Sequence, residues 1–262
     1  MTVEPKSIND IQPVGPRKPE ANKSAFRSIL LWILRHPILT LVLLLLGIVV
    51  IEFFSLPGTT TIEALESANP PTTALMEERK RVREEVGKSS KRLQRWVPLS
   101  KISPELIHAV IVAEDGTFYE HGGFDWYEVQ ESLEKNWNEG RVARGGSTIT
   151  QQLAKNLFLS TSKDPMRKLK EAYITMQMER MLSKDRILEL YLNLIEWGDG
   201  LYGAEAAAQE SFGKSAAELS REEAARVAAV IPNPLRHKPN DDSRYISFRM
   251  QIILAMMEAR GW

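Results

Sequence analysis

Most of this chain alternates apolar and polar residues with the spacing of helices, but one early stretch is apolar on every side. Between Pro37 and Leu56 the sole charged residue is Glu52. At about 1.5 Å per helical residue, a run of this length can cross a hydrocarbon core of about 30 Å. The pattern therefore predicts a transmembrane helix over residues 37–56.

Basic residues lie mainly on one side of this predicted helix. Lys18, Lys23, Arg27 and Arg35 come before it, and the next basic residue after it is Arg79. Because positive residues are retained in the cytoplasm, we expect the N-terminus inside and the rest of the chain outside. A cleaved signal peptide is the competing interpretation, but the apolar run is too long and no small-residue cleavage site follows it directly.

The segments that flank the predicted helix carry loop and linker signals. Residues 1–36 are basic and, in their first part, rich in proline, so we expect a disordered segment in the cytoplasm. Proline, glycine and threonine are frequent in residues 57–73, which predicts a linker. The folded domain is then expected to occupy residues 74–262.

The pattern in this domain is helical almost throughout. Ser103 and Pro104 are typical of a helix start, and the apolar residues that follow predict a buried helix that delivers Glu114 to its end. Residues 77–85 mix both charges, which favours a solvent-exposed helix over a binding surface. Since no alternating strand pattern of useful length is found, we expect an all-α domain.

Composition narrows the chemistry that this domain can perform. The chain has 34 basic and 34 acidic residues, and the net charge of zero gives no reason to expect nucleic-acid binding. Cysteine is absent, which excludes disulfides and thiol catalysis, and the four histidines are scattered without the spacing of metal ligands. We therefore expect no metal site built from these residues and look for chemistry in local clusters.

The first cluster is the carboxylate pair at the end of the buried helix, Glu114 and Asp115. Burial and the negative end of a helix dipole both disfavour an ionised carboxyl, so we expect a raised pKa at Glu114 and the strength of a general base. His121 follows in a polar segment, and we interpret it as a structural hydrogen-bonding residue rather than a proton shuttle.

The second cluster begins with two glycines followed by Ser147 and further hydroxyl residues. Free amides at the start of the next helix would bind an anion. Gln152 and Lys155 share one face of that helix and could point toward the same ligand. An ordinary turn with a capped helix is the alternative, and spacing alone leaves both open.

The third cluster places Arg167, Lys168 and Lys170 just before Glu171. Salt bridges within one helix would explain this spacing. Three cations shortly after Lys155 would equally form a positive patch suited to a pyrophosphate. The sequence alone does not decide between a salt bridge and a phosphate site.

Taken together, these clusters resemble the glycosyltransferase domain of peptidoglycan polymerases, and in particular the monofunctional biosynthetic peptidoglycan transglycosylases. The resemblance covers about residues 75–239. It rests on five segments in order: Glu114–Asp125, Gly145–Asn156, Arg167–Glu171, Lys184–Asn193 and Ile231–Pro234. It implies an all-α, lysozyme-like fold with a head lobe and a jaw lobe, and it favours the anion-binding interpretation of the second cluster.

The resemblance also implies a reaction. A lipid-linked growing glycan would be transferred from its undecaprenyl pyrophosphate to the 4-hydroxyl of the N-acetylglucosamine of lipid II, forming a β-1,4 bond with inversion. Glu114 would be the general base and Glu171 a second catalytic carboxylate. The residues that would bind substrate are Ser147, Gln152, Lys155, Asn156, Lys163, Arg167, Lys168 and Lys170. The resemblance requires no cofactor and leaves open a divalent cation such as Mg²⁺ at the pyrophosphate.

Location and partners follow from the same resemblance. The predicted anchor would make the enzyme a single-pass protein of the bacterial cytoplasmic (inner) membrane with a periplasmic catalytic domain. Its expected partners are lipid II, the growing glycan and the membrane, while contacts with proteins of the cell-wall synthesis machinery stay open. A lysozyme-like, glycan-cleaving enzyme and an inactive membrane-anchored scaffold are the alternatives. A cleaving enzyme needs no pyrophosphate site, and intact Glu114, Lys155 and Glu171 count against a dead site.

Overall fold

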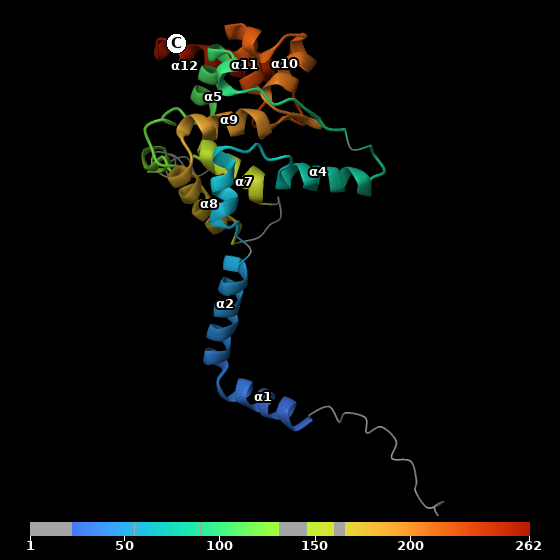
Figure 1. Cartoon of the computed structure of the whole chain (residues 1–262), viewed down its shortest axis with the longest axis vertical. Helices are drawn as coiled ribbons and strands as arrows, with labels where there is room; N and C mark the ends of the chain where they lie inside the picture. The colour runs from blue at the N-terminus through green and yellow to red at the C-terminus, as the bar shows by residue number, and fades with distance from the viewer. Residues whose placement is uncertain (1–22, 55, 90, 131–145, 160–165) are drawn as a thin grey trace, which may run out of the picture. The chain divides into compact units, whose positions relative to one another are not determined.

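The computed structural model describes residues 23–54, 56–89, 91–130, 146–159 and 166–262. The helices are α1 (Lys23–Arg35), α2 (Pro37–Phe54), α3 (Thr59–Glu63), α4 (Ala74–Glu85), α5 (Pro104–Glu114), α7 (Ile149–Phe158), α8 (Arg167–Met181), α9 (Lys184–Leu194), α10 (Ala204–Phe212), α11 (Arg221–Ala229) and α12 (Arg244–Ala259) (Figure 1). The 3₁₀ helices are η2 (Ala64–Glu66), η3 (Leu99–Lys101) and η4 (Ala216–Glu218). The strands are β1 (Leu93–Gln94), β2 (Glu196–Gly198) and β3 (Leu201–Tyr202). The chain divides into two units, Met1–Ser55 and Leu56–Trp262.

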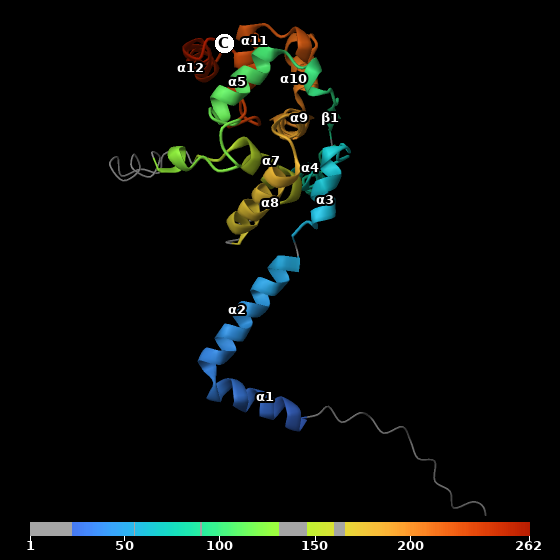
Figure 2. The same ribbon diagram turned by 60° about the vertical axis from the view of Figure 1, so that its left-hand side comes forward.

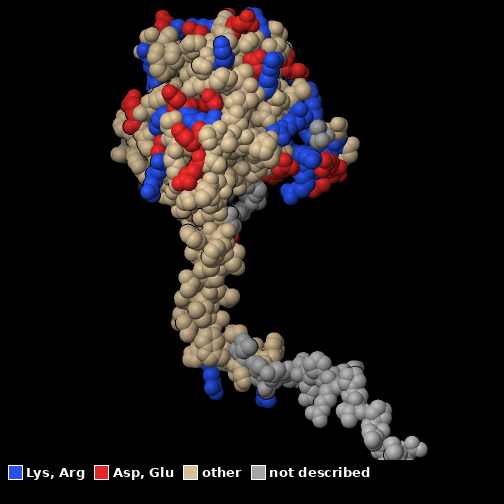
Figure 3. Space-filling view, viewed as in Figure 1, with Lys and Arg blue, Asp and Glu red and all other residues tan. Residues whose placement is uncertain are grey.

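The first unit consists of α1 and α2. Within the described residues, one helical stretch is long and apolar enough to cross a membrane, and it includes α2. The large aliphatic side chains whose exposure is described in α2 are exposed, and the surface of this helix in Figure 3 is almost free of charged atoms. The sequence predicts a disordered segment over residues 1–36, whereas Lys23–Arg35 form the helix α1. The run of apolar residues from position 29 to 34 contains no proline and supports a helix there. Residues 1–22 lie outside the described residues.

The segment expected as a linker, residues 57–73, contains α3 and η2 and belongs to the second unit. Ile62 and Leu65 lie three residues apart on one face and are 0% and 5% exposed. Arg186 of α9 donates to the carbonyl oxygen of Leu65 (2.7 Å) and of Ala68 (2.9 Å). The folded unit therefore begins before residue 74, because this short segment carries enough apolar surface to join the core.

The second unit is built from two groups of helices. One group packs α5 against α11 and α12, and the other packs α7 against α8 and α9, with α3 on α8 and α4 on α7. Figures 1 and 2 show the two groups at opposite ends of this unit, with α9 between them. The architecture agrees with the expected all-α, lysozyme-like class.

The three strands were not anticipated, since two or three residues are too few to show an alternating pattern. Their order is β1-β3-β2, with β1 parallel and β2 antiparallel to β3. The Leu93 amide donates to the Gly200 carbonyl at 2.8 Å. Gly200 has a φ of 70° and lies so close to the Lys91 carbonyl that a Cβ would not fit. This close approach fixes the chain before β1 against β3.

Candidate active site

Helix α5 places Glu114 at the junction of the two helix groups. The Ser103 hydroxyl caps this helix by accepting from the Glu105 amide at 3.2 Å, and it also donates to the Leu219 carbonyl at 3.1 Å. The apolar side chains of α5 are buried in the core. Glu114 is the last helical residue, and its side chain is 10% exposed. The predicted buried helix is thus present and ends with the predicted carboxylate.

The amide of Gln152 holds this carboxylate. Its Nε2 donates to Glu114 Oε2 at 2.9 Å, and its Oε1 accepts from the Tyr191 hydroxyl at 3.0 Å. The buried position of Tyr191, with Glu114 and Asp115 nearby, raises the pKa of its hydroxyl well above the usual value. Tyr191 therefore stays protonated and fixes which end of the Gln152 amide faces Glu114.

Arg249 of α12 approaches the same carboxylate from the other side. Its Nη2 lies 4.0 Å from Glu114 Oε1, its side chain is 15% exposed, and its buried Nε has no hydrogen-bond partner among the described residues. Sequence reasoning missed Arg249. The available signal was an arginine inside an otherwise mostly apolar helix, because such residues are rarely buried without a charged partner.

The second carboxylate of the pair has a structural role. Asp115 is 2% exposed, and its oxygens accept from His121 Nε2 (2.8 Å) and from the Ile149 amide (3.0 Å). The Gly123 amide donates to His121 Nδ1 at 3.1 Å, so this nitrogen carries no proton and the other one does. These bonds confirm the hydrogen-bonding role expected for His121 and tie the end of α5 to the start of α7.

Gly123 brings the loop after α5 against α8. Its φ is 90°, and a Cβ at this position would lie 2.7 Å from Thr175 Cγ2. The Gly123 carbonyl accepts from the Thr148 hydroxyl at 2.8 Å. A residue without a side chain is therefore required where the loop, α7 and α8 meet.

The start of α7 corrects one expectation. The Thr148 hydroxyl accepts from the Gln151 amide at 3.2 Å, and the Gln151 side chain accepts from the Thr148 amide at 3.0 Å. The Ile149 amide is bonded to Asp115. Because the protein itself uses these amides, the capped-helix interpretation is confirmed, and an anion would have to meet side chains farther along the helix.

Those side chains line a cavity of about 220 Å³, the catalytic cavity. Gln152, Lys155 and Asn156 of α7 form one wall, and Tyr191, Ile231 and Pro234 contribute from the fourth and fifth predicted segments. Ser147 is half-buried beside it, with its carbonyl 3.4 Å from Gln152 Nε2. The structure thus brings together residues that the sequence places far apart.

Lys155 lies among charges of both signs. Burial lowers the pKa of its ammonium group; nearby Glu171 and Glu114 act in the opposite direction, while Arg167 and Lys168 add to the lowering. Two carboxylates and two further cations therefore surround this lysine. A polyanionic ligand here would favour the charged form of Lys155 and relieve its repulsion from the other cations.

Glu171 connects this lysine with the third cluster. It is 4% exposed, and it forms a salt bridge with Lys168 one helical turn before it. The salt bridge expected as one alternative is therefore present. Arg167 and Lys170 are half-buried, whereas Lys163 lies outside the described residues. In the described part of the chain, no three His, Asp or Glu side chains group into a metal site, and we assign no step to a metal ion.

Arg79 of α4 is a second residue that sequence reasoning missed. Its Nε and Nη2 both lie 3.0 Å from Glu196 Oε2, and both residues line the catalytic cavity. Burial raises the pKa of Glu196, and the Arg79 charge opposes that effect. The mixed-charge pattern of residues 77–85 gave no sign that one of its members turns inward.

This arrangement can be compared with known proteins. Residues 79–258 match the model of the transglycosylase family. The chain belongs to this family. It is therefore an enzyme of glycosyl transfer, and the matched residues include all five segments on which the resemblance rested.

Several curated relatives extend the match. The biosynthetic peptidoglycan transglycosylase of Nitrosospira multiformis is 49% identical over 189 residues, 72% of this chain and 82% of the relative. That of Methylobacillus flagellatus is 48% identical over the same length, with the same coverage. That of Janthinobacterium sp. (strain Marseille) is 40% identical over 233 residues, 89% of this chain and 96% of the relative. The last match extends the likeness over most of both chains.

Proposed function

We propose that this transglycosylase polymerises the glycan chains of peptidoglycan from lipid II. The observation that carries the proposal is the position of Glu114 relative to Lys155. Gln152, which holds the Glu114 carboxylate at 2.9 Å, lines the same cavity as the positively charged side chain of Lys155. A general base and a cationic site for a departing anion are the two requirements of glycosyl transfer from a pyrophosphate. Relatives named as biosynthetic peptidoglycan transglycosylases support the choice of substrate.

In the proposed step, Glu114 accepts the proton of the 4-hydroxyl on the acceptor N-acetylglucosamine. The oxygen attacks C1 of the donor N-acetylmuramic acid from the face opposite the pyrophosphate. The bond from C1 to the pyrophosphate oxygen breaks, and its electron pair leaves with the pyrophosphate, so the configuration inverts to β. Gln152 orients the carboxylate for the proton transfer, and Arg249 supplies a positive charge beside it.

The departing pyrophosphate would be stabilised by the cations around Lys155. The positive charges of Arg167 and Lys168 help to lower the pKa of Lys155. This electrostatic interaction supports a ligand shared by the three cations. Charge-assisted contacts to phosphate oxygens are the strongest hydrogen bonds available to these side chains. In this proposal Glu171 keeps Lys168 in place and balances the cations while the site is empty of ligand. Ser147, Asn156, Lys163 and Lys170 complete the proposed substrate-binding set.

The apolar helix α2 supports a membrane anchor for this chemistry. We propose that it spans the cytoplasmic (inner) membrane once, with the N-terminus in the cytoplasm and the catalytic domain in the periplasm. Arg27 and Arg35 before α2, and the absence of basic residues from its end to Arg79, favour this orientation. Lipid II and the growing glycan, both membrane-bound, would be the partners, while contacts with proteins of the cell-wall synthesis machinery stay open.

The proposal is tested by Glu114→Gln in the full chain, solubilised in detergent and supplied with lipid II. Glutamine keeps the size of the side chain but does not accept the proton, so polymerisation should fall by about 10²–10⁴. Glu120→Gln, at an exposed carboxylate of the same segment, is the matched control and should retain normal activity. More than a tenth of normal polymerisation in a folded Glu114→Gln variant would contradict the role of Glu114. Release of soluble fragments from cell-wall sacculi by the unchanged chain would instead favour glycan cleavage.

A further inference from the structure

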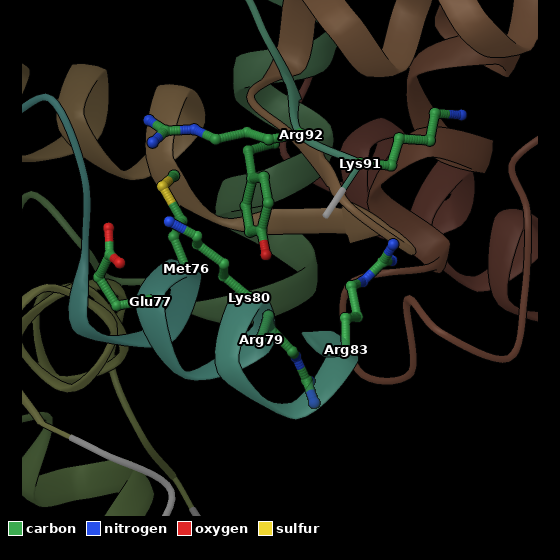
Figure 4. A pocket seen from close by; sticks show the side chains of 8 residues that line it. Met76, Glu77, Arg79, Lys80, Arg83, Lys91 and Arg92 are labelled. Carbon is green, nitrogen blue, oxygen red and sulfur yellow. The ribbon is translucent and has the colours of Figure 1, made fainter. Parts of the chain in front are cut away.

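A second cavity, of about 240 Å³, lies between α4 and the chain that leads into β1 (Figure 4). We call it the basic cavity. On the face shown in Figure 3, Lys and Arg side chains gather where α4 projects, with acidic side chains beside them. The charged residues that line the cavity are Glu77, Arg79, Lys80, Arg83, Lys91 and Arg92.

Ion pairs within the protein account for part of this positive charge. Arg79 is bound to the buried Glu196 at 3.0 Å, and Arg83 forms an ion pair with Asp199. These two arginines hold α4 against the chain around β2. Their positive charge is largely compensated, so they alone would not indicate a ligand.

Lys80 and Arg92 are different. Among the described residues, Lys80 has no hydrogen bond or ion pair, and Arg92 binds the neutral oxygens of Pro71 and Gln94. In Figure 4 the charged ends of Lys80 and Arg92 come to the same side of the cavity, where the end of Met76 also lies. Two cations without carboxylate partners therefore face one cavity.

The remaining charged residues offset this excess only in part. Lys91 lies 3.8 Å from Glu210, and both side chains are more than half exposed, so the pair is weak. The Glu77 carboxylate accepts from the neutral Thr72 hydroxyl at 2.6 Å, so it keeps its negative charge and offsets one of the two cations. The backbone at residue 91 is fixed against Gly200, so Arg92 starts from a rigid position. The basic cavity thus keeps a net positive charge that suits an anionic group.

The basic cavity adjoins the catalytic cavity. Arg79 lines both of them, and its partner Glu196 lines the catalytic one. A substrate that occupies the catalytic cavity and carries a side branch could place that branch beyond Arg79. Continuity with the catalytic cavity favours a part of the substrate as the ligand over an unrelated anion.

We propose that the basic cavity binds carboxylate groups of the peptide carried by the glycan substrate. This inference rests on the proposed function. The pyrophosphate is already assigned to the cations around Lys155, and the sugar rings are neutral, so the peptide is the remaining anionic part of the substrate. Lys80 and Arg92 provide the contacts, and Arg79 marks the boundary between the sugar and peptide sites.

The test compares two substrates of the detergent-solubilised full chain. One is lipid II with free peptide carboxylates, and the other is lipid II in which those carboxylates are converted to amides. The unchanged chain should use the acidic form with a kcat/KM about three- to tenfold higher, as expected for two exposed charge contacts. The preference should decrease as salt is added. A double variant, Lys80→Gln with Arg92→Gln, should bring the ratio close to one.

Lys101→Gln, at an exposed lysine outside both cavities, is the matched control and should keep the preference. Because Arg92 also binds Pro71, thermal unfolding of each variant is measured, and Lys80→Gln alone should reduce the ratio if the double variant fails to fold. An equal ratio in the unchanged chain and the folded variant would overturn the inference while leaving the proposed function intact. No turnover of either substrate by the unchanged chain would contradict the proposed function, and the inference would fall with it.

Discussion

The two sides of the candidate active site are built in different ways. The side that holds Glu114 is a network of directed hydrogen bonds through Gln152, Tyr191 and Asp115. The side around Lys155 and Glu171 consists of charges near one another, with an exposed lysine as one member. Proton transfer requires a defined distance and angle, whereas stabilising a departing anion requires mainly charge. The difference suggests that substitutions on the first side act through geometry and those on the second through electrostatics.

The largest effect that would test this comparison is expected at Asp115. Asp115→Ala leaves the Ile149 amide and His121 without their buried acceptor, so we expect the free energy of unfolding to fall by about 3 kcal/mol. Activity should fall with it, because the end of α5 is released from α7. Denaturant unfolding of the full chain measures the change. Asp185→Ala, at an exposed carboxylate bonded to the Tyr119 hydroxyl, should cost less than about 0.5 kcal/mol.

Gln152 tests geometry more directly. Gln152→Leu keeps the approximate size but removes the bonds to Glu114 and Tyr191, and loss of a bond to a charged group costs about 1.5–3 kcal/mol. We expect kcat to fall about ten- to a hundredfold. The exposed Gln209, changed to leucine, should show no such loss. A normal kcat in a folded Gln152→Leu variant would show that the hydrogen-bond network does not position Glu114.

On the side around Lys155 and Glu171, the effect of removing a cation should depend on how deeply that cation is buried. Lys155→Ala removes a half-buried cation and should lower kcat/KM about tenfold, whereas Lys168→Ala removes one that is 61% exposed and should lower it about two- to fivefold. Both losses should become smaller at high salt, which screens the exposed cation most. Equal losses in the two variants, or no dependence on salt, would contradict an electrostatic role.

The smallest effect concerns stability rather than activity. The lowered pKa of Lys155 means that folding disfavours its charged form, and this penalty is fully present below the lowered pKa. As pH rises through that value toward 10.5, the usual value for lysine, the penalty disappears. Lys155→Met should therefore raise the free energy of unfolding at pH 7 by roughly 0.5–1 kcal/mol, and less at pH 10. Lys101→Met should change stability at neither pH.

Local sequence patterns were enough to predict, in outline, the side of the candidate active site that holds Glu114. The cap at Ser103 and the apolar residues after it predicted a buried helix ending at Glu114, and that helix is present. The shared face of Gln152 and Lys155 was also predictable, because they lie three positions apart on one helix. In both cases the determining interactions lie within a few residues along the chain.

Contacts between distant segments were not predictable in this way. Arg249 reaches Glu114 from the final helix, and Arg79 reaches the catalytic cavity from a helix whose charges resemble those of a solvated face. The Ile149 amide at the start of α7 looked free because its partner, Asp115, belongs to another segment. Residues 57–73 looked like a linker because their prolines and threonines outnumber the few apolar residues that become buried.

Gly123 has no side chain, and this allows the loop after α5 to pack directly against α8. Its Cα lies so near Thr175 that one added methyl group would push against α8, and the Thr175 hydroxyl is bonded to the backbone carbonyl of Glu171 at 2.8 Å. The loop after α5 therefore packs against the helix that carries Glu171 with only a bare backbone between them. Any larger residue at position 123 would displace that loop or α8, and with α8 the carboxylate of Glu171.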